Sequence, residues 1–187
     1  MTITSSENLV DEAWTLRVGR HPLLVRPSGV RDLPGLARMH GRCSARSLLD
    51  RYRTGGRPPT VAALDLALRR PLGVVAITAT GDVVAHGQLR PDPAHNERCV
   101  EVGLLVEDRW QGLGIGRELM THLAGVAHVV GFHELIAYPA TALTPAQRLM
   151  VEIGRTRQVS DRDLHLHTYL PESAGLGMGA VRQRLAG

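Results

Sequence analysis

Apolar residues recur with two different periods along the chain, and the change of period predicts which segments are helices and which are strands. Leu23–Arg26 is a short apolar run that stops at Pro27, which predicts a first strand. Helical spacing of apolar residues follows in short segments that begin near Asp32, Ser44 and Thr60. Ser44 and Thr60 favour helix starts because their hydroxyl groups accept a hydrogen bond from a backbone amide of the first turn. The first third of the chain is therefore predicted to be a strand followed by two or three helices.

Beyond Pro71 the period shortens to that of strands. Three strands in series are expected at 73–79, 83–89 and 99–106. Residues 114–130 then carry the longest helical pattern, and Gly131 ends it. The remaining elements are expected to be a strand at 135–138, a helix at 145–153 and a last strand at 164–170. This order predicts a mixed α/β (α+β) fold, with a mostly antiparallel central sheet flanked by helices.

The chain of 187 residues is long enough for one domain and shows no internal repeat or linker. Residues 1–20 are predicted to be an irregular lead-in and 21–170 the folded domain. Residues 171–187 contain four glycines and no clear period, so a flexible tail is expected there.

Several features favour a soluble protein of the cytoplasm. Glu7, Asp11 and Glu12 interrupt the N-terminal segment, which argues against a signal peptide. No stretch approaches the roughly 18 apolar residues of a membrane span. Cys43 and Cys99 are too few for a disulfide framework, which favours a reducing compartment. We therefore expect no contact with a membrane.

All positively charged side chains of the chain are arginine. The absence of lysine excludes lysine Schiff bases, lysine nucleophiles and the lysine of a nucleotide-binding Walker A loop. The net charge of +4 favours anionic partners such as phosphorylated cofactors. Aromatic residues make up only 3% of the chain, which argues against a nucleic-acid surface that stacks bases, so no nucleic-acid partner is expected.

The segment with the clearest chemistry is the strand at 99–106 together with the glycine-rich turn that leads into the long helix. Glycines at 112, 114 and 116 leave backbone amides uncovered at a helix N-terminus, which is an arrangement suited to phosphate groups. Arg117 adds a positive charge. The spacing G-x-G-x-G differs from the dinucleotide fingerprint G-x-G-x-x-G. An alternative is that these glycines only ease a turn between a strand and a helix.

The run Gln111–Gly116 resembles the Q/R-x-x-G-x-G/A motif of the GNAT superfamily of acyl-CoA-dependent N-acetyltransferases. The order of elements from residue 22 to about 170 is similar to that family as well. The resemblance implies that acetyl-CoA is the cofactor and that its pyrophosphate lies on the amides of the turn. It also implies that the pantetheine arm pairs with the end of the strand through backbone groups. The cofactor-binding residues implied in this way are Leu104, Leu105, Val106, Gln111, Gly112, Leu113, Gly114, Ile115, Gly116 and Arg117.

A second segment, Cys43–Tyr52, is similar to the Leu-Ser-x-x-Ser-x-x-x-Arg-Phe segment in GNAT domains of bacterial protein-lysine acetyltransferases. In that fold the segment lies where acceptor substrates are shaped. A plain capped helix is the alternative interpretation.

Glu101 is the candidate catalytic residue, because it matches a glutamate that serves some family members as the base. The alternative is a strand acid that faces solvent. The tyrosine that protonates the leaving thiolate in many GNAT enzymes corresponds here to Met150, which carries no proton to donate. Tyr138 is a substitute for it, with a packed strand aromatic as the alternative.

The nine histidines include His165 and His167 on one face of the last strand. No cysteine or acid completes a close set of ligands with them in the sequence, so no metal site is expected. A serine hydrolase is not supported either, because the chain has no G-x-S-x-G elbow.

Together these patterns predict transfer of an acetyl group from acetyl-CoA to a primary amine. The amine belongs to a small molecule, a protein lysine or a protein N-terminus, and a homodimer is an open possibility. The alternative is an acyl-CoA-binding sensor or regulatory module that has lost catalysis, because the usual tyrosine is replaced.

Overall fold

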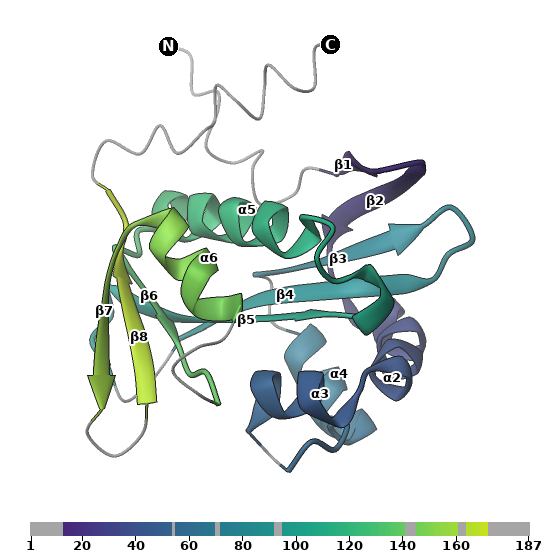
Figure 1. Cartoon of the computed structure of the whole chain (residues 1–187), viewed down its shortest axis with the longest axis horizontal. Coiled ribbons are helices and arrows are strands. Elements are labelled where there is room, and N and C mark those ends of the chain that lie inside the picture. Colours follow the sequence, from purple (N-terminus) through teal and green to yellow (C-terminus); the bar gives the residue numbers. More distant parts are fainter. Residues whose placement is uncertain are drawn as a thin grey trace.

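A computed structural model describes residues 13–53, 55–69, 72–91, 95–140, 145–160 and 164–171. They form one eight-stranded sheet with helices on both faces (Figure 1). The strands are β1 (Trp14–Val18), β2 (His21–Pro27), β3 (Gly73–Thr78), β4 (Val83–Pro91), β5 (Cys99–Val106), β6 (Glu134–Ala137), β7 (Arg155–Ser160) and β8 (Leu164–Tyr169). The helices are α2 (Leu33–Arg42), α3 (Ala45–Tyr52), α4 (Val61–Leu68), α5 (Ile115–Val130) and α6 (Pro145–Ile153), and two short 3-10 turns lie at Val30–Asp32 and Asp108–Trp110.

The strands are ordered β1-β2-β3-β4-β5-β6-β8-β7 across the sheet. Every neighbouring pair is antiparallel except β5 and β6, which run parallel. β5 and β6 run parallel because α5 connects them. The helix carries the chain back to the end of the sheet where β5 begins, so β6 starts at that end and runs in the same direction. The predicted mixed fold with a mostly antiparallel sheet is confirmed.

Each face of the sheet has its own apolar core. On one face α5 packs with fully buried Leu119 and Leu123 against β4 and β5, and α6 lies beside α5. On the other face α2, α3 and α4 enclose a smaller cluster that includes Leu36, Met39 and Leu48. Figure 1 shows these three helices below the sheet and α5 with α6 above it.

The capping predictions for α3 and α4 are confirmed. The hydroxyl of Ser44 accepts a hydrogen bond from the amide of Ser47, and that of Thr60 accepts one from the amide of Ala63. At the end of α5, Gly131 adopts a left-handed conformation with a φ of 100° and closes the helix.

The prediction that residues 1–20 are irregular is wrong for Trp14–Val18, which form β1 and pair with β2. The signal was present in the sequence, because Trp14, Leu16 and Val18 alternate with Thr15 and Arg17. The structure shows the first three partly or fully buried and the other two exposed. Residues 1–12 lie outside the described part of the chain.

Strand β7 was not predicted from the sequence, and β4 runs beyond the predicted end at 89 to Pro91. Most positions of β7 are exposed, so the segment lacks the apolar alternation that reveals a half-buried strand. It stands at the edge of the sheet, where exposed polar side chains are common because they oppose pairing with other chains.

The tail predicted at 171–187 lies outside the described residues except for Pro171. Within the described residues, none of the helices is both long and apolar enough to cross a bilayer.

Candidate active site

The glycine turn after β5 exposes backbone amides at the start of α5. Gly112 and Gly114 have φ values of 73° and 86°, in the left-handed region that other residues adopt only with strain. A Cβ atom at either position would meet nothing within 4 Å, so the backbone conformation, and not space, requires glycine there. No side chain caps the N-terminus of α5, and the amide of Glu118 makes the first helical hydrogen bond, to the carbonyl of Gly114. The amides ahead of Glu118 are therefore available to an anion.

Strand β5 leaves one of its edges open beside this turn. Its ladder with β4 reaches from Pro91 paired with Val100 to Ala85 paired with Val106. Its ladder with β6 on the other side ends where Glu101 faces Ile136. Among the described residues, the segment 102–106 therefore has no strand partner on that side, and an extended ligand could pair with its backbone there.

A cleft of about 1500 Å³ joins the open edge and the turn. Its walls come from β4, β5, α3, α4, the glycine turn, the end of β6 and α6. The predicted site residues that line it are Glu101, Leu104, Leu105, Val106, Gln111, Gly112, Gly114, Gly116 and Arg117. Two others do not line it: the side chain of Ile115 is buried in the core, and that of Leu113 is exposed.

Polar contacts fix the turn to the start of α3. The carboxylate of Asp108 accepts hydrogen bonds from the hydroxyls of Ser44 (2.6 Å) and Ser47 (3.0 Å), and from the amide of Ser44 (2.8 Å). Gln111 Nε2 donates to Ser47 Oγ and to the carbonyl of Val106, both at 2.9 Å. Partial burial raises the pKa of Asp108, but the hydrogen bonds from Ser44 and Ser47 outweigh it and hold that pKa below its usual value. The side chain of Gln111 is thus hydrogen-bonded to α3 and to the end of β5, and it stabilises the turn through these contacts.

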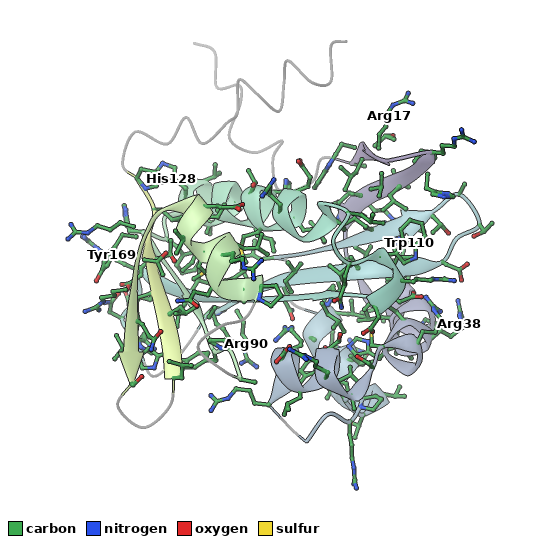
Figure 2. The ribbon with its side chains drawn as sticks, viewed as in Figure 1. Arg17, Arg38, Arg90, Trp110, His128 and Tyr169 are labelled. Carbon is green, nitrogen blue, oxygen red and sulfur yellow. The ribbon has the colours of Figure 1, made fainter. Side chains whose placement is uncertain are left out.

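Glu101 lies inside the cleft beside a positively charged neighbour. The two residues Arg90 and Glu101 face each other across β4 and β5, and Arg90 Nε and Nη2 both donate to Glu101 Oε2. The Glu101 side chain is only 12% exposed, which contradicts the alternative of a strand acid in open solvent. Figure 2 shows Arg90 on the face of the sheet that carries α3 and α4.

Arg51 on α3 reaches across the cleft to β5. Its guanidinium group lies so close to Gly103 that a Cβ there would be 2.1 Å from Arg51 Cζ. Among the described residues no carboxylate forms an ion pair with Arg51, and its Cζ atom lies 4.8 Å from the ring centroid of Tyr52. Burial, and then the charge of Arg51, lower the pKa of nearby His86 to about 3, so His86 is neutral. This packing could not be predicted, because α3 and β5 are about 50 residues apart in the chain and leave no local pattern.

Arg117 is oriented by a residue that was not predicted. Its Nε and Nη2 donate to the two oxygens of Glu152 on α6, at 2.8 and 2.9 Å. Both side chains are exposed at the mouth of the cleft. Arg117 therefore faces the cleft with part of its charge already balanced.

Comparison with protein families gives one decisive match. The model of the acetyltransferase (GNAT) family matches residues 44–154, more than half of the chain. This chain belongs to the GNAT family.

Solved structures agree with this assignment at the level of the fold. The GNAT domain of S. lividans PAT matches with a TM-score of 0.72 and 22% identity, over 86% of this chain and 97% of that one. A GNAT phosphinothricin acetyltransferase from Sinorhizobium meliloti, solved with AcCoA, matches with a TM-score of 0.64 and 19% identity, over 82% and 91%. The acetyltransferase yncA from Salmonella typhimurium, solved with acetyl-CoA, matches with a TM-score of 0.61 and 19% identity, over 81% and 96%. No curated protein sequence matches the chain.

The GNAT cleft of this protein departs from the usual pattern at α6. Met150 is fully buried in the core and does not line the cleft, where the neighbouring Leu149 does. Two tyrosines, Tyr52 and Tyr138, line it. His40 Nδ1 lies 2.7 Å from the carbonyl of Leu36, so it is the donor there, and His40 Nε2 accepts from the Tyr52 hydroxyl at 2.6 Å. The proton of Tyr52 is thus already committed to His40.

Proposed function

We propose that this GNAT protein transfers an acetyl group from acetyl-CoA, its cosubstrate, to a primary amine, with Glu101 as the base. The observation that carries the proposal is that one cleft joins the glycine turn and the open edge of β5 to Glu101. The two solved GNAT structures that hold acetyl-CoA support the choice of cosubstrate.

The residues at the turn fit the phosphate end of acetyl-CoA. The uncapped amides at 115–117 and the positive end of the α5 dipole favour a pyrophosphate, and Gly112 and Gly114 keep these amides uncovered. The open edge of β5 at 102–106 fits the amide groups of the pantetheine arm, which offer hydrogen-bond donors and acceptors to a strand edge. Arg117 contributes its charge at the same end.

At the other end of the cleft, Glu101 is placed to accept a proton from the amine. The amine nitrogen attacks the thioester carbonyl carbon, the carbon–sulfur bond breaks, and the amine loses one proton to Glu101, directly or through water. The hydrogen bonds from Arg90 hold the carboxylate in one orientation, which reduces the cost of positioning it for each turnover. The thiolate that leaves takes up a proton, for which Tyr138 is the candidate donor among the cleft phenols, because Tyr52 donates to His40.

The acceptor amine remains a small molecule, a protein lysine or a protein N-terminus. Arg51 lies over Gly103, in the segment of β5 proposed to pair with the pantetheine arm, and forms no ion pair with a carboxylate among the described residues. A guanidinium group binds a carboxylate with two parallel hydrogen bonds. We therefore expect better turnover with amines that carry an acidic group near the nitrogen than with matched neutral amines.

A second function is favoured by Met150, whose burial leaves α6 without the usual proton donor. In that function the chain binds acyl-CoA as a sensor or regulatory module and does not turn it over. Both functions predict binding of acetyl-CoA, and only the first predicts transfer.

Release of the free thiol from acetyl-CoA, measured with a panel of acidic, neutral and basic amines and with lysine peptides, separates the two. The enzyme function predicts amine-dependent thiol release and an acetylated product of matching mass. It also predicts that Glu101→Gln lowers kcat by about 100-fold or more, the usual size of a general base contribution. Asp65→Asn, which alters an exposed ion pair on α4, is the matched control and should leave kcat unchanged. Binding of acetyl-CoA with no thiol release on any amine would instead favour the sensor.

A further inference from the structure

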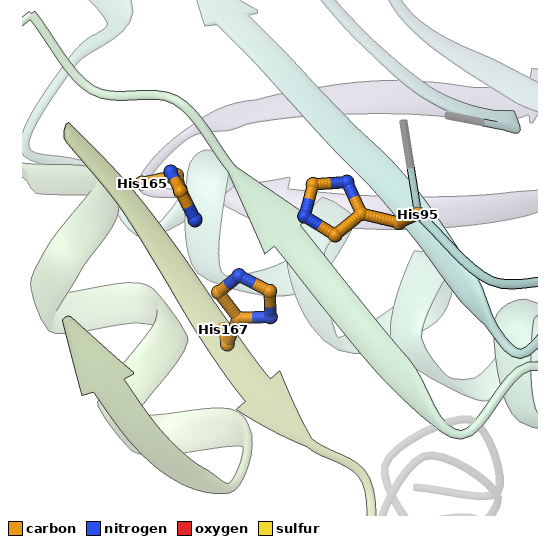
Figure 3. A group of neighbouring side chains, drawn as sticks. All are labelled: His95, His165 and His167. Carbon is orange, nitrogen blue, oxygen red and sulfur yellow. The ribbon is translucent and has the colours of Figure 1, made fainter. Parts of the chain in front are cut away.

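Three histidine rings converge on the sheet face that carries Glu101. His165 and His167 are alternate residues of β8, and His95 comes from the segment between β4 and β5 (Figure 3). The ring centroids are 4.8 Å apart for His165 and His167, 5.2 Å for His95 and His167, and 5.8 Å for His95 and His165. One nitrogen from each ring lies within 4.8 Å of those of the other two. Figure 3 shows the three rings arranged around a common space.

These separations are those of imidazoles that share one metal ion. A zinc–nitrogen bond of about 2.0–2.1 Å puts each ring centroid about 3.2 Å from the metal, and tetrahedral angles then separate two centroids by about 5.2 Å. The three observed separations lie on both sides of that value. The bonded nitrogens would be about 3.4 Å apart in such a site. Nitrogens that are up to 4.8 Å apart would have to approach one another by as much as about 1.4 Å to close around an ion, a distance that small changes in side-chain torsion angles can cover.

A buried carboxylate already fixes one of the rings. Glu134 on β6 is 9% exposed, and its Oε1 is hydrogen-bonded to His167 Nδ1. The other oxygen of Glu134 accepts a hydrogen bond from the thiol of Cys99 at 3.1 Å. Since Nδ1–H donates to the carboxylate, the lone pair of His167 is on Nε2. A histidine oriented by a carboxylate in this way is the common arrangement of a metal ligand and its supporting partner.

We propose that His95, His165 and His167 form a three-histidine site for a divalent zinc-type ion, with Glu134 as the supporting carboxylate. Imidazole nitrogens suit zinc, copper and nickel, and three of them leave a fourth position for water or another ligand. No metal site was predicted from the sequence, because no cysteine or acid completes a close set of ligands with the histidines there. His95 is 70 residues from His165 in the chain and supplies the third ligand.

The histidine site lies close to the end of the cleft that holds Glu101, the end proposed to receive the acceptor amine. Glu101 faces Ile136 across β5 and β6, and Ile136 faces His167 across β6 and β8, so all three lie in one row on one face. Two strand spacings separate Glu101 from His167 by about 10 Å between their Cα atoms. The ring of Tyr138, a cleft residue, lies 5.6 Å from that of His165. Metal binding itself does not depend on acetyl transfer, so the two proposals fail independently.

The site is tested with the full chain, without an affinity tag, after removal of metal with EDTA. Titration with Zn²⁺ by calorimetry should give one ion per chain. Titration with Co²⁺ should give the intense visible absorption of a four-coordinate ion. His95→Gln and His165→Gln should each lower the Zn²⁺ affinity by about 100-fold or more, and Glu134→Gln by about 10-fold, the range seen for supporting partners.

His21→Gln is the matched control, because His21 is exposed on β2, near the edge of the sheet opposite to β8. It should retain the wild-type affinity and the cobalt spectrum. Circular dichroism of each variant without metal checks that it is folded. Failure of the wild-type chain to bind Zn²⁺ or Co²⁺ at one ion per chain would overturn the proposal. Equal affinity in the His95→Gln and His165→Gln double variant would overturn it as well.

Discussion

The two ends of the cleft are built in different ways. At the glycine turn the cleft presents backbone amides from one short stretch, 112–117, at the start of α5. At the other end, around Glu101, it presents side chains from separate elements: Arg51 from α3, Arg90 from β4 and Glu101 from β5. The first end needs only a backbone conformation that glycine permits, whereas the second needs three elements in the right register. We therefore expect binding and transfer to be separable by mutation.

The largest effect is expected at the glycine turn. Gly114→Val puts a β-branched residue at a φ of 86°, which costs about 1–3 kcal/mol and forces the turn to rearrange. Loss of two or more hydrogen bonds to charged phosphate oxygens should lower acetyl-CoA affinity by about 100-fold or more in calorimetry. Gly81→Val is a close control, because Gly81 has a φ of 87° in the β3–β4 turn, outside the cleft. It should lose similar stability and keep its affinity for acetyl-CoA. Equal loss of binding in both variants would show that the glycine turn does not bind the pyrophosphate.

The next effect is expected where α3 meets β5. Gly103→Ala places a methyl group on the Arg51 guanidinium, which must move because it is the flexible end of a side chain. We expect kcat to fall by about 10-fold, as a displacement of about 1 Å costs up to 100-fold, while acetyl-CoA affinity changes little. Thermal unfolding should be almost unchanged. Gly41→Ala, on the exposed side of α2 with no contact within 4 Å, is the control and should leave kcat at the wild-type value. A normal kcat in Gly103→Ala would show that Arg51 has no part in transfer.

The difference between the two ends also explains what could be predicted from the sequence. The strand Cys99–Val106 was predicted with its observed bounds, and the glycine turn with the start of α5 to within one residue, because local pattern and backbone preference determine them. The burial of Glu101 beside Arg90 could not be predicted, since it depends on the pairing register of β4 and β5. Strand β7 was missed because its polar residues at a sheet edge resemble a loop.

Contacts between segments that are far apart in the chain could not be predicted from the sequence for the same reason. Asp108 bonds to Ser44 and Ser47 across more than 60 residues, and His95 meets β8 across about 70. Neither contact leaves a local pattern. Ser44 and Ser47 belong to the segment that resembles GNAT domains, but the sequence did not identify Asp108 as their hydrogen-bond partner.

A smaller effect is expected at Asp108, whose hydrogen bonds to Ser44 and Ser47 join the glycine turn to α3. Asp108→Ala removes the acceptor for three hydrogen bonds at an exposed site, which should lower stability at pH 7 by about 1 kcal/mol after solvent screening. The folded-state pKa of Asp108 lies below its usual value, so its contribution is present above that value and is lost as pH falls through the folded-state pKa. In urea unfolding, the gap between wild type and Asp108→Ala should therefore be full at pH 7 and shrink in strong acid. A gap that stays constant with pH would show that the ionised carboxylate is not responsible.

The smallest effect is expected at the rim of the glycine turn. Arg117→Gln should lower acetyl-CoA affinity a few-fold, and Glu152→Gln should raise it slightly, because it releases Arg117 from its ion pair. The effects of both substitutions on acetyl-CoA affinity should become smaller as salt is added. Affinity measured at low and high ionic strength checks the opposite signs; identical affinity in the two variants would place Arg117 outside the binding site.

The separation of binding from transfer is tested most directly by one comparison between wild type and Glu101→Gln. Calorimetric titration with acetyl-CoA and thiol release with the best amine acceptor are measured on the same two preparations. We predict one bound acetyl-CoA per chain with affinities equal within about two-fold, and a loss of about 100-fold or more in turnover for the variant. Absence of binding by the wild-type chain, or equal turnover in both, would contradict the account.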